Sequence, residues 1–155
     1  QHVILEVTEC VYLGDRDNVV ASEIKALREH GLLVALDDFG TGYASLTHLL
    51  TIPVDILKID KSFVDGLAHS NGAAAIIKGV LGISRDLGIR VVAEGVETLG
   101  QVRELRALGC ALGQGYYFSR PVTRDSAKQL LTDGLSRLAP VSSAALLRFP
   151  GTGRL

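Results

Sequence analysis

The 155-residue sequence contains no tryptophan, and only 5% of its residues are aromatic. A core without large rings has to be built mainly from leucine, valine, isoleucine and alanine, and hydrophobic residues make up 47% of the chain. This composition is typical of a parallel α/β protein. The chain length falls in the range of one domain.

Cysteine and histidine are too few and too scattered to suggest a zinc site. The two cysteines, Cys10 and Cys110, lie far apart and fit neither a zinc knuckle nor a Cys-x-x-Cys redox pair. The four histidines show no ligand spacing. We therefore interpret both cysteines as buried apolar residues and expect no bound zinc.

Long apolar runs and an excess of charge are also absent. The longest run of small apolar residues, 72–83, is interrupted by Lys78 and is too short to span a bilayer. No signal segment opens the chain. The net charge of −1 argues against a broad nucleic-acid or anionic-membrane surface but leaves room for a small anionic ligand bound through metal. We expect a soluble cytoplasmic domain without direct membrane insertion, even if a longer parent protein is membrane-anchored.

What the sequence does contain is a regular alternation of strand and helix patterns. Helix signals include a capping box at Thr98-Leu99-Gly100-Gln101 and an N-cap at Thr123. From Ala139 the pattern loses its period, and we expect a loosely ordered tail over residues 139–155. Strands are predicted at 3–7, 32–37, 55–60, 90–94 and 110–118, and helices at 19–30, 44–50, 73–87, after Thr98 and after Thr123.

Such alternation predicts a parallel sheet, either open and doubly wound or part of a barrel. Polar residues at the carboxyl end of every strand favour the barrel, because a barrel collects its site from many strand ends. A complete barrel has eight strands and about 250 residues, so we predict an incomplete (β/α)8 TIM-like barrel of about five parallel strand-helix units. The strand-end residues are Glu6, Glu9, Asp37, Asp38, Lys58, Asp60, Glu94, Glu97 and Gln114.

Two adjacent carboxylates, Asp37 and Asp38, end a buried strand and precede a glycine-rich loop. They can converge only if the backbone turns between them, and they repel each other unless a cation lies nearby. Hard divalent ions take such oxygen ligands, although a lone Asp-Asp pair is more often a surface turn. Glu6 shares a strand face with Ile4, so an inward Ile4 implies an inward carboxylate that needs a partner; the alternative is a solvated strand end.

Five motifs follow one another along the chain. They are Glu6-Val7-Thr8-Glu9, Asp37-Asp38-Phe39-Gly40-Thr41-Gly42-Tyr43, Leu57-Lys58-Ile59-Asp60, Val92-Ala93-Glu94-Gly95-Val96-Glu97-Thr98 and Gly113-Gln114-Gly115-Tyr116-Tyr117-Phe118-Ser119-Arg120-Pro121. In this order they resemble the EAL domain, the bacterial family of cyclic di-GMP phosphodiesterases that act in signal transduction. The resemblance implies that residues 1–138 form the C-terminal part of such a domain, beginning at the fourth strand. The Glu-Ala-Leu strand and a metal-binding asparagine then have no counterpart here.

The resemblance also implies a two-metal site for Mg²⁺ or Mn²⁺. Glu6 and Asp37 would bind one ion, and Asp37, Asp38 and Glu94 would bind the other. Catalytic roles would fall to Lys58, Glu94 and Gln114. Surrounding carboxylates keep the Lys58 ammonium protonated, so we expect it to orient water or stabilise phosphoryl charge rather than act as a base. The alternative is a structural pair with Asp60 or Asp55.

Two further glutamates complete the expected set. Glu97 resembles a substrate-binding carboxylate that contacts guanine or supports the site, and Glu9 one that steadies the Asp-Asp-Phe-Gly loop. The implied reaction is hydrolysis of cyclic di-GMP to linear pGpG, and the alternatives are an inactive cyclic di-GMP receptor or a regulatory module. Because unpaired sheet edges invite pairing, we expect a homo-oligomer or contact with the missing N-terminal part.

Overall fold

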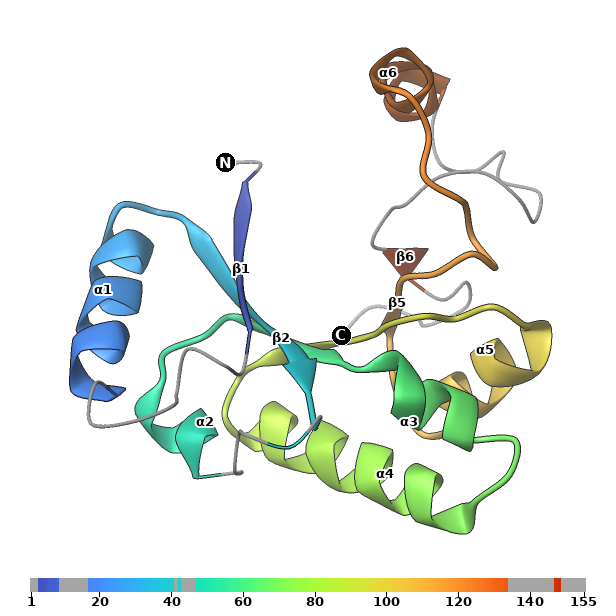
Figure 1. The fold of residues 1–155 in the computed structure, drawn as a ribbon, viewed down its shortest axis with the longest axis horizontal. Coiled ribbons are helices and arrows are strands. Elements are labelled where there is room, and N and C mark those ends of the chain that lie inside the picture. The colour runs from blue at the N-terminus through green and yellow to red at the C-terminus, as the bar shows by residue number, and fades with distance from the viewer. Residues whose placement is uncertain (1–2, 9–16, 41, 43–46, 134–146, 149–155) are drawn as a thin grey trace.

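The computed structural model describes residues 3–8, 17–40, 42, 47–133 and 147–148, and it alternates strands with helices as predicted (Figure 1). The strands are β1 (Ile4–Thr8), β2 (Leu33–Phe39), β3 (Ile56–Ile59), β4 (Arg90–Ala93), β5 (Leu112–Gly113) and β6 (Leu147–Arg148). The helices are α1 (Asp17–Glu29), α2 (His48–Thr51), α3 (Lys61–Gly66), α4 (Asn71–Asp86), α5 (Leu99–Ala107) and α6 (Arg124–Asp133).

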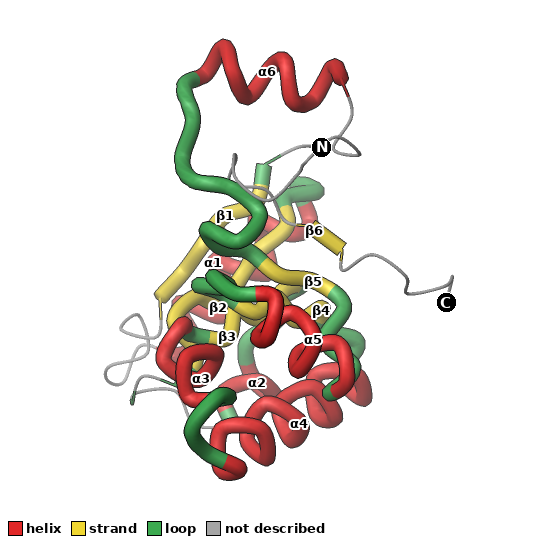
Figure 2. The backbone as a smooth tube through the Cα atoms, turned by 90° about the vertical axis from the view of Figure 1, so that its right-hand side faces the viewer, coloured by secondary structure: helices red, strands yellow, loops and turns green. Residues whose placement is uncertain are grey.

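One sheet runs through the molecule in the order β1-β2-β3-β4-β5-β6. The first five strands are parallel, and β6 pairs with β5 in the antiparallel direction. Figure 2 shows α3, α4 and α5 gathered on one side of the strands. The sheet is open between β1 and β6, so the predicted α/β fold, an incomplete barrel of parallel strand-helix units, is confirmed.

Alternate residues of each strand face two different environments. Leu36 and Leu57 belong to a large apolar cluster that the strands share with α4 and α5, including Ile77 and Leu105. The strand residues that alternate with these point to the opposite face, where a smaller cluster contains Ala35, Ile56 and Val92, with Ile4 packed against it. Because side chains alternate along a strand, this second face is also the one toward which Glu6, Lys58 and Glu94 project.

The helix starts follow the local sequence. The predicted capping box of α5 is present: the Thr98 side chain accepts a hydrogen bond from the Gln101 N–H, and the Gln101 side chain accepts one from the Thr98 N–H. Helix α3 was not predicted. The third strand ends at Ile59 rather than Asp60, because the Asp60 carboxylate accepts the Ser62 N–H at 3.0 Å and caps α3. Residues 44–46 of the predicted helix 44–50 lie outside the described residues.

The fifth strand is much shorter than the predicted 110–118. Only Leu112–Gly113 pairs with β4, because the chain turns at Gly115, where the N–H groups of Phe118 and Ser119 both donate to the Gly115 carbonyl. The sequence also missed β6, which covers β5 by pairing Gly113 with Leu147. That edge, predicted to be unpaired, therefore has a partner at Leu112 and Gly113. The loose tail over 139–155 stays a prediction, since only 147–148 of it is described.

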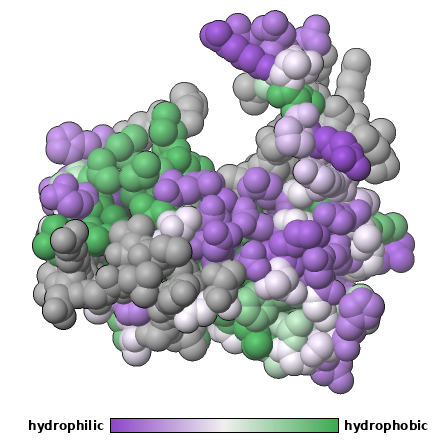
Figure 3. All heavy atoms as spheres, viewed as in Figure 1, coloured by the Kyte–Doolittle hydropathy of each residue, from purple (hydrophilic) through white to green (hydrophobic). Residues whose placement is uncertain are grey.

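The opposite edge of the sheet exposes apolar side chains. Val3 is 64% exposed and Leu5 39%, and Val19 at the start of α1 is 60% exposed. Hydrophobic atoms accordingly gather over α1 and β1 in Figure 3. The predicted contact of this edge with another chain or with further strands stays a prediction. Among the helices that the structure describes, none combines the length and apolar character needed to cross a bilayer.

Asp55 ties the amino-terminal ends of the strands together. Its carboxylate accepts hydrogen bonds from Arg28 Nε and Nη2, at 2.8 to 3.2 Å, and from the N–H of the buried Val34 at 2.9 Å. We predict that Asp55→Ala lowers the free energy of unfolding by roughly 1–3 kcal/mol, because the Val34 N–H loses its partner. Denaturant unfolding would measure this. Glu23→Ala, on the exposed face of α1, is the control and should change stability little.

Gly115 lies against the backbone of the segment that follows β4. A Cβ at this position would overlap the Val96 nitrogen and carbonyl oxygen, which bond to Gln114 O and Tyr117 N at 3.0 and 2.9 Å. We predict that Gly115→Ala costs about 1–3 kcal/mol or more and speeds hydrogen exchange at Val96, because the backbone cannot yield as a flexible side chain would. Gly79→Ala, which meets open space in α4, should be neutral or stabilising. Equal stability of the two variants would contradict this reading.

Candidate functional site

A lysine surrounded by three carboxylates lies at the carboxyl ends of the strands. Lys58 Nζ is 2.9 Å from Glu6 Oε1, 3.0 Å from Asp37 Oδ1 and 2.8 Å from Glu94 Oε1. The Lys58 side chain is only 6% exposed. We call these four residues the Lys58 centre. Its members come from β1, β2, β3 and the residue after β4, so neighbouring strands each supply one charged group.

The parallel register explains why these groups meet. Glu6 pairs with Ala35, and Lys58 pairs with Val92, so each strand brings its polar residue to the same edge of the sheet. The inward direction inferred for Glu6 from Ile4 is confirmed by its ion pair with Lys58. The proposed structural pairs of Lys58 are wrong: Asp55 binds Arg28, and Asp60 caps α3.

The surroundings of the Lys58 centre shift the pKa values of Lys58 and Glu94. Burial alone would lower the pKa of Lys58, but hydrogen bonds to Glu94, Glu6 and Asp37 outweigh it and raise that pKa above its usual value. Lys58 therefore carries a proton at neutral pH. Burial raises the pKa of Glu94, the Lys58 ammonium opposes the rise, and the nearby Asp37 carboxylate adds to it.

The two adjacent aspartates do converge. One carboxylate oxygen from each of Asp37, Asp38 and Glu94 lies within 4.8 Å of the others. Asp38 has φ of 56°, a left-handed conformation, and its N–H donates to Asp37 Oδ1 at 3.0 Å. The register between β2 and β3 also shifts between Leu36 and Phe39, which marks a bulge. Strand β2 thus continues to Phe39 instead of ending at Asp37, and the bulge supplies the turn that brings the two carboxylates together.

The other predicted residues lie beside this centre or outside the described chain. The Gln114 backbone bonds to the end of β4 and to the segment after that strand, since its N–H donates to Ala93 O and its carbonyl accepts from Val96 N. Glu97 is not part of the Lys58 centre; its carboxylate binds Lys61 at 2.9 Å. Glu9, and hence its predicted contact with the loop after Asp38, lies outside the described residues.

Lys61 is a residue that the sequence analysis missed. Its ammonium contacts Asp65 at 3.1 Å as well as Glu97. The four-residue spacing from Lys61 to Asp65 could have suggested a helical ion pair. Nothing in a single sequence reveals the contact with Glu97, which lies 36 positions away.

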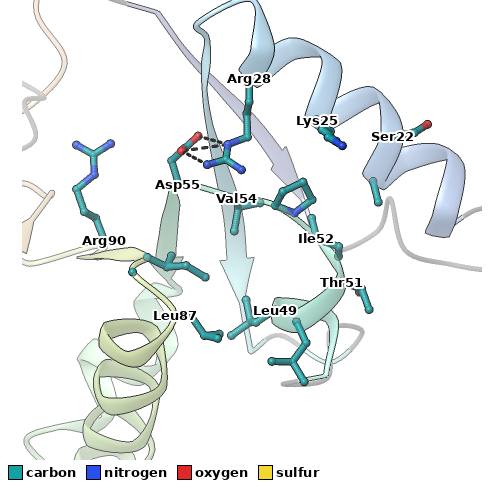
Figure 4. Close-up of a pocket in the computed structure, with 15 residues that line it drawn as sticks. Ser22, Lys25, Arg28, Leu49, Thr51, Ile52, Val54, Asp55, Leu87 and Arg90 are labelled. Carbon is teal, nitrogen blue, oxygen red and sulfur yellow. Dashed lines mark hydrogen bonds and ion pairs between the residues drawn. The ribbon is translucent and has the colours of Figure 1, made fainter.

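A groove of about 690 Å³ lies at the other end of the sheet, where β3 and β4 begin. Figure 4 shows its apolar floor, including Leu49 and Ile52, and the Arg28 guanidinium turned toward Asp55. Lys25 and Arg90 stand on its rim. The groove is separate from the Lys58 centre, because it is lined by parts of α1 and α2 and by the chain where it enters β3 and β4, whereas the centre lies at the far ends of those strands.

Comparison with known proteins gives a consistent set of relatives. The curated protein MucR of Pseudomonas aeruginosa, named a bifunctional diguanylate cyclase/cyclic di-GMP phosphodiesterase, is 42% identical over 132 residues, covering 84% of this chain and 18% of MucR. The crystal structure of the EAL domain of Mycobacterium smegmatis DcpA superposes with a TM-score of 0.80 at 39% identity, covering 85% of this chain and 59% of that one.

A third relative was solved with ligands. The structure of Klebsiella pneumoniae BlrP1 in complex with manganese and cyclic di-GMP matches with a TM-score of 0.69 at 41% identity, covering 77% of this chain and 30% of that one. The chain spans less than a fifth of the length of MucR. The family model described as EAL domain matches residues 1–121. The chain therefore belongs to the EAL domain family.

Proposed function

We propose that the domain to which this chain belongs hydrolyses cyclic di-GMP to linear pGpG. The observation that carries the proposal is the Lys58 centre, in which a protonated lysine lies among Glu6, Asp37 and Glu94. The name of MucR and the ligands of BlrP1 support the same substrate.

The donor set fits a divalent cation. Asp37, Asp38 and Glu94 present carboxylate oxygens within 4.8 Å of one another, and such hard ligands suit Mg²⁺ or Mn²⁺. We propose that these three residues hold one ion and that Glu6 and Asp37 hold a second. When bound, the ions would supply positive charge next to the phosphodiester oxygens.

The chain's own side chains would do the rest. In hydrolysis the oxygen of water forms a bond to phosphorus and one P–O ester bond of the ring breaks. The water gives up a proton, and the released ester oxygen takes up a proton to become a hydroxyl, so the cyclic dinucleotide becomes linear. The three N–H donors of the protonated Lys58 point at Glu6, Asp37 and Glu94 in this structure. If those carboxylates hold metal ions, a donor of Lys58 would become available to orient the water or to stabilise the charge on the phosphoryl oxygens. Gln114, directly after β5, would hydrogen-bond near that water, and Glu97 would contact the substrate.

The remaining expectations from the sequence stay proposals. Cyclic di-GMP would be the partner, without nucleic acid, and the domain would act in the cytoplasm. The two alternatives, a receptor that binds cyclic di-GMP without cleaving it and a regulatory module, differ from the enzyme in turnover. The presence of all three carboxylates around Lys58 favours the enzyme.

The enzyme hypothesis predicts large losses of turnover in a protein that contains this chain and the rest of its domain. Glu6→Gln, Asp37→Asn and Lys58→Ala should each reduce hydrolysis of cyclic di-GMP by about 100-fold or more, because each removes a group that we propose to act at the reacting phosphate. Chromatographic detection of pGpG would measure this, with Glu104→Gln on the exposed face of α5 as the control.

Ordinary turnover in any of the three variants would contradict the assignment of that residue. If the unaltered protein binds cyclic di-GMP but releases no pGpG, the receptor alternative is correct.

The metal proposal can be tested without any reaction. Asp38→Asn should weaken Mn²⁺ binding by about 10-fold or more, because it replaces a charged ligand with a neutral one. Electron paramagnetic resonance of free Mn²⁺, without nucleotide, would measure the affinity. Asp86→Asn, at the exposed end of α4, is the matched control. An unchanged Mn²⁺ affinity in Asp38→Asn would show that this carboxylate is not a ligand.

A further inference from the structure

The side chain of Glu97 is held by a lysine from the neighbouring strand-helix unit. Lys61, the first residue of α3, places its Nζ 2.9 Å from Glu97 Oε1 and 3.1 Å from Asp65 Oδ1. Helices α3 and α5 lie side by side in both ribbon views, and Glu97 lies in the segment between β4 and α5 (Figures 1 and 2). Lys61 therefore bridges two units of the barrel.

The backbone of Glu97 is held from the other side. Gln101 Oε1 accepts the N–H groups of Glu97 and Thr98 at 2.8 and 2.9 Å. Gln101 Nε2 donates to Asp65 Oδ1 at 3.2 Å. Both arms thus end on the same Asp65 oxygen, and the hydrogen bonds form a closed network around Glu97. The second carboxylate oxygen of Glu97 has no partner among the described residues and is available to a ligand.

The absence of a side chain at Gly95 leaves room for the Lys61 side chain. Gly95 has φ of +65°, and a Cβ built on it would lie 2.6 Å from Lys61 Cβ and Cδ. The stem of Lys61 therefore crosses the backbone between Glu94 of the Lys58 centre and Glu97. This close packing fixes the direction of the ammonium, although the Lys61 side chain is 43% exposed.

We propose that Lys61 is a positioning residue for substrate recognition, which holds the Glu97 carboxylate so that its second oxygen accepts N–H donors from a guanine base. This inference rests on the proposed function and deepens it. A carboxylate is an acceptor only, and the N1–H and 2-amino groups of guanine are donors. Without Lys61, Asp65 and Glu97 would lose their shared cation, and the Glu97 side chain would be free to turn away. Lys61 acts on binding and not on the reacting phosphate.

The first experiment compares substitutions of Lys61 in a protein that contains the complete domain. Lys61→Met should raise the KM for cyclic di-GMP about 10-fold and leave kcat within about threefold, because a charge-assisted contact of the base is lost. Lys61→Arg, which keeps the charge, should restore most of the affinity. Lys78→Met, an exposed α4 lysine, is the control and should match the unaltered protein. Exposed ion pairs contribute little to stability, so all three variants should fold.

The second experiment asks whether Lys61 acts through Glu97. In a Glu97→Gln background, Lys61→Met should cause no further rise in KM, because the residue that it positions is already altered. The inosine analogue of cyclic di-GMP lacks the 2-amino group. The unaltered protein should prefer cyclic di-GMP over this analogue, and Lys61→Met should reduce the preference.

The results of these experiments distinguish a failure of the role proposed for Lys61 from a failure of the proposed function. If the unaltered protein neither binds nor hydrolyses cyclic di-GMP, the proposed function is wrong and the inference falls with it. If the unaltered protein is active, three results would overturn the inference alone: an unchanged KM in Lys61→Met, a loss confined to kcat, or an equal effect of Lys61→Met with and without Glu97.

Discussion

The interaction on which the structure depends is the burial of one ammonium group among three carboxylates. Taking the Lys58 charge out of water is costly, and the cost is offset only because Glu6, Asp37 and Glu94 lie within 3.0 Å of its nitrogen. The carboxylates in turn need the cation, since they would otherwise repel one another. The register of β1 to β4 is therefore constrained, because a slip by one residue would turn one partner to the opposite face.

Because side chains alternate along a strand, one strand can contribute apolar residues to the core on one face and charged residues to the Lys58 centre on the other. In β3, Leu57 and Ile59 pack into the large apolar cluster beneath the helices, while Ile56 and Lys58 face the other way. The charged groups thus add no polar atoms to the main core. At the opposite end of the strands, Asp55 satisfies Arg28 and the Val34 N–H, which fixes the place where β2 and β3 begin. The charged residues of the Lys58 centre therefore lie on strands that are fixed by the apolar core and by Asp55 at the opposite end.

Sequence patterns predicted the parts of this arrangement that depend on local chemistry. The parallel fold, the capping box at Thr98, and the inward direction of Glu6 all follow from spacing along the chain. The bulge at Asp37 and Asp38 does not, because periodicity indicates which face a residue takes but not where the hydrogen-bond register shifts. A helix of six residues such as α3 is too short to show a clear period. The contact between Lys61 and Glu97 required the fold itself, since neither residue is near the other in sequence.

The two lysines of β3 and α3 form similar pairs in very different surroundings. Lys58 binds Glu94 at 2.8 Å, and Lys61 binds Glu97 at 2.9 Å. Each partner of the second pair lies three positions after its counterpart in the first. The turn at Asp60 places Lys58 on the inner strand face and Lys61 on helix α3. Their lysine side chains are 6% and 43% exposed. Salt screens the exposed pair far more than the buried one, so the inner pair is held by its burial, whereas the outer pair depends on the packing of the Lys61 stem against Gly95 and on the hydrogen bond from Gln101 to Asp65 for its geometry.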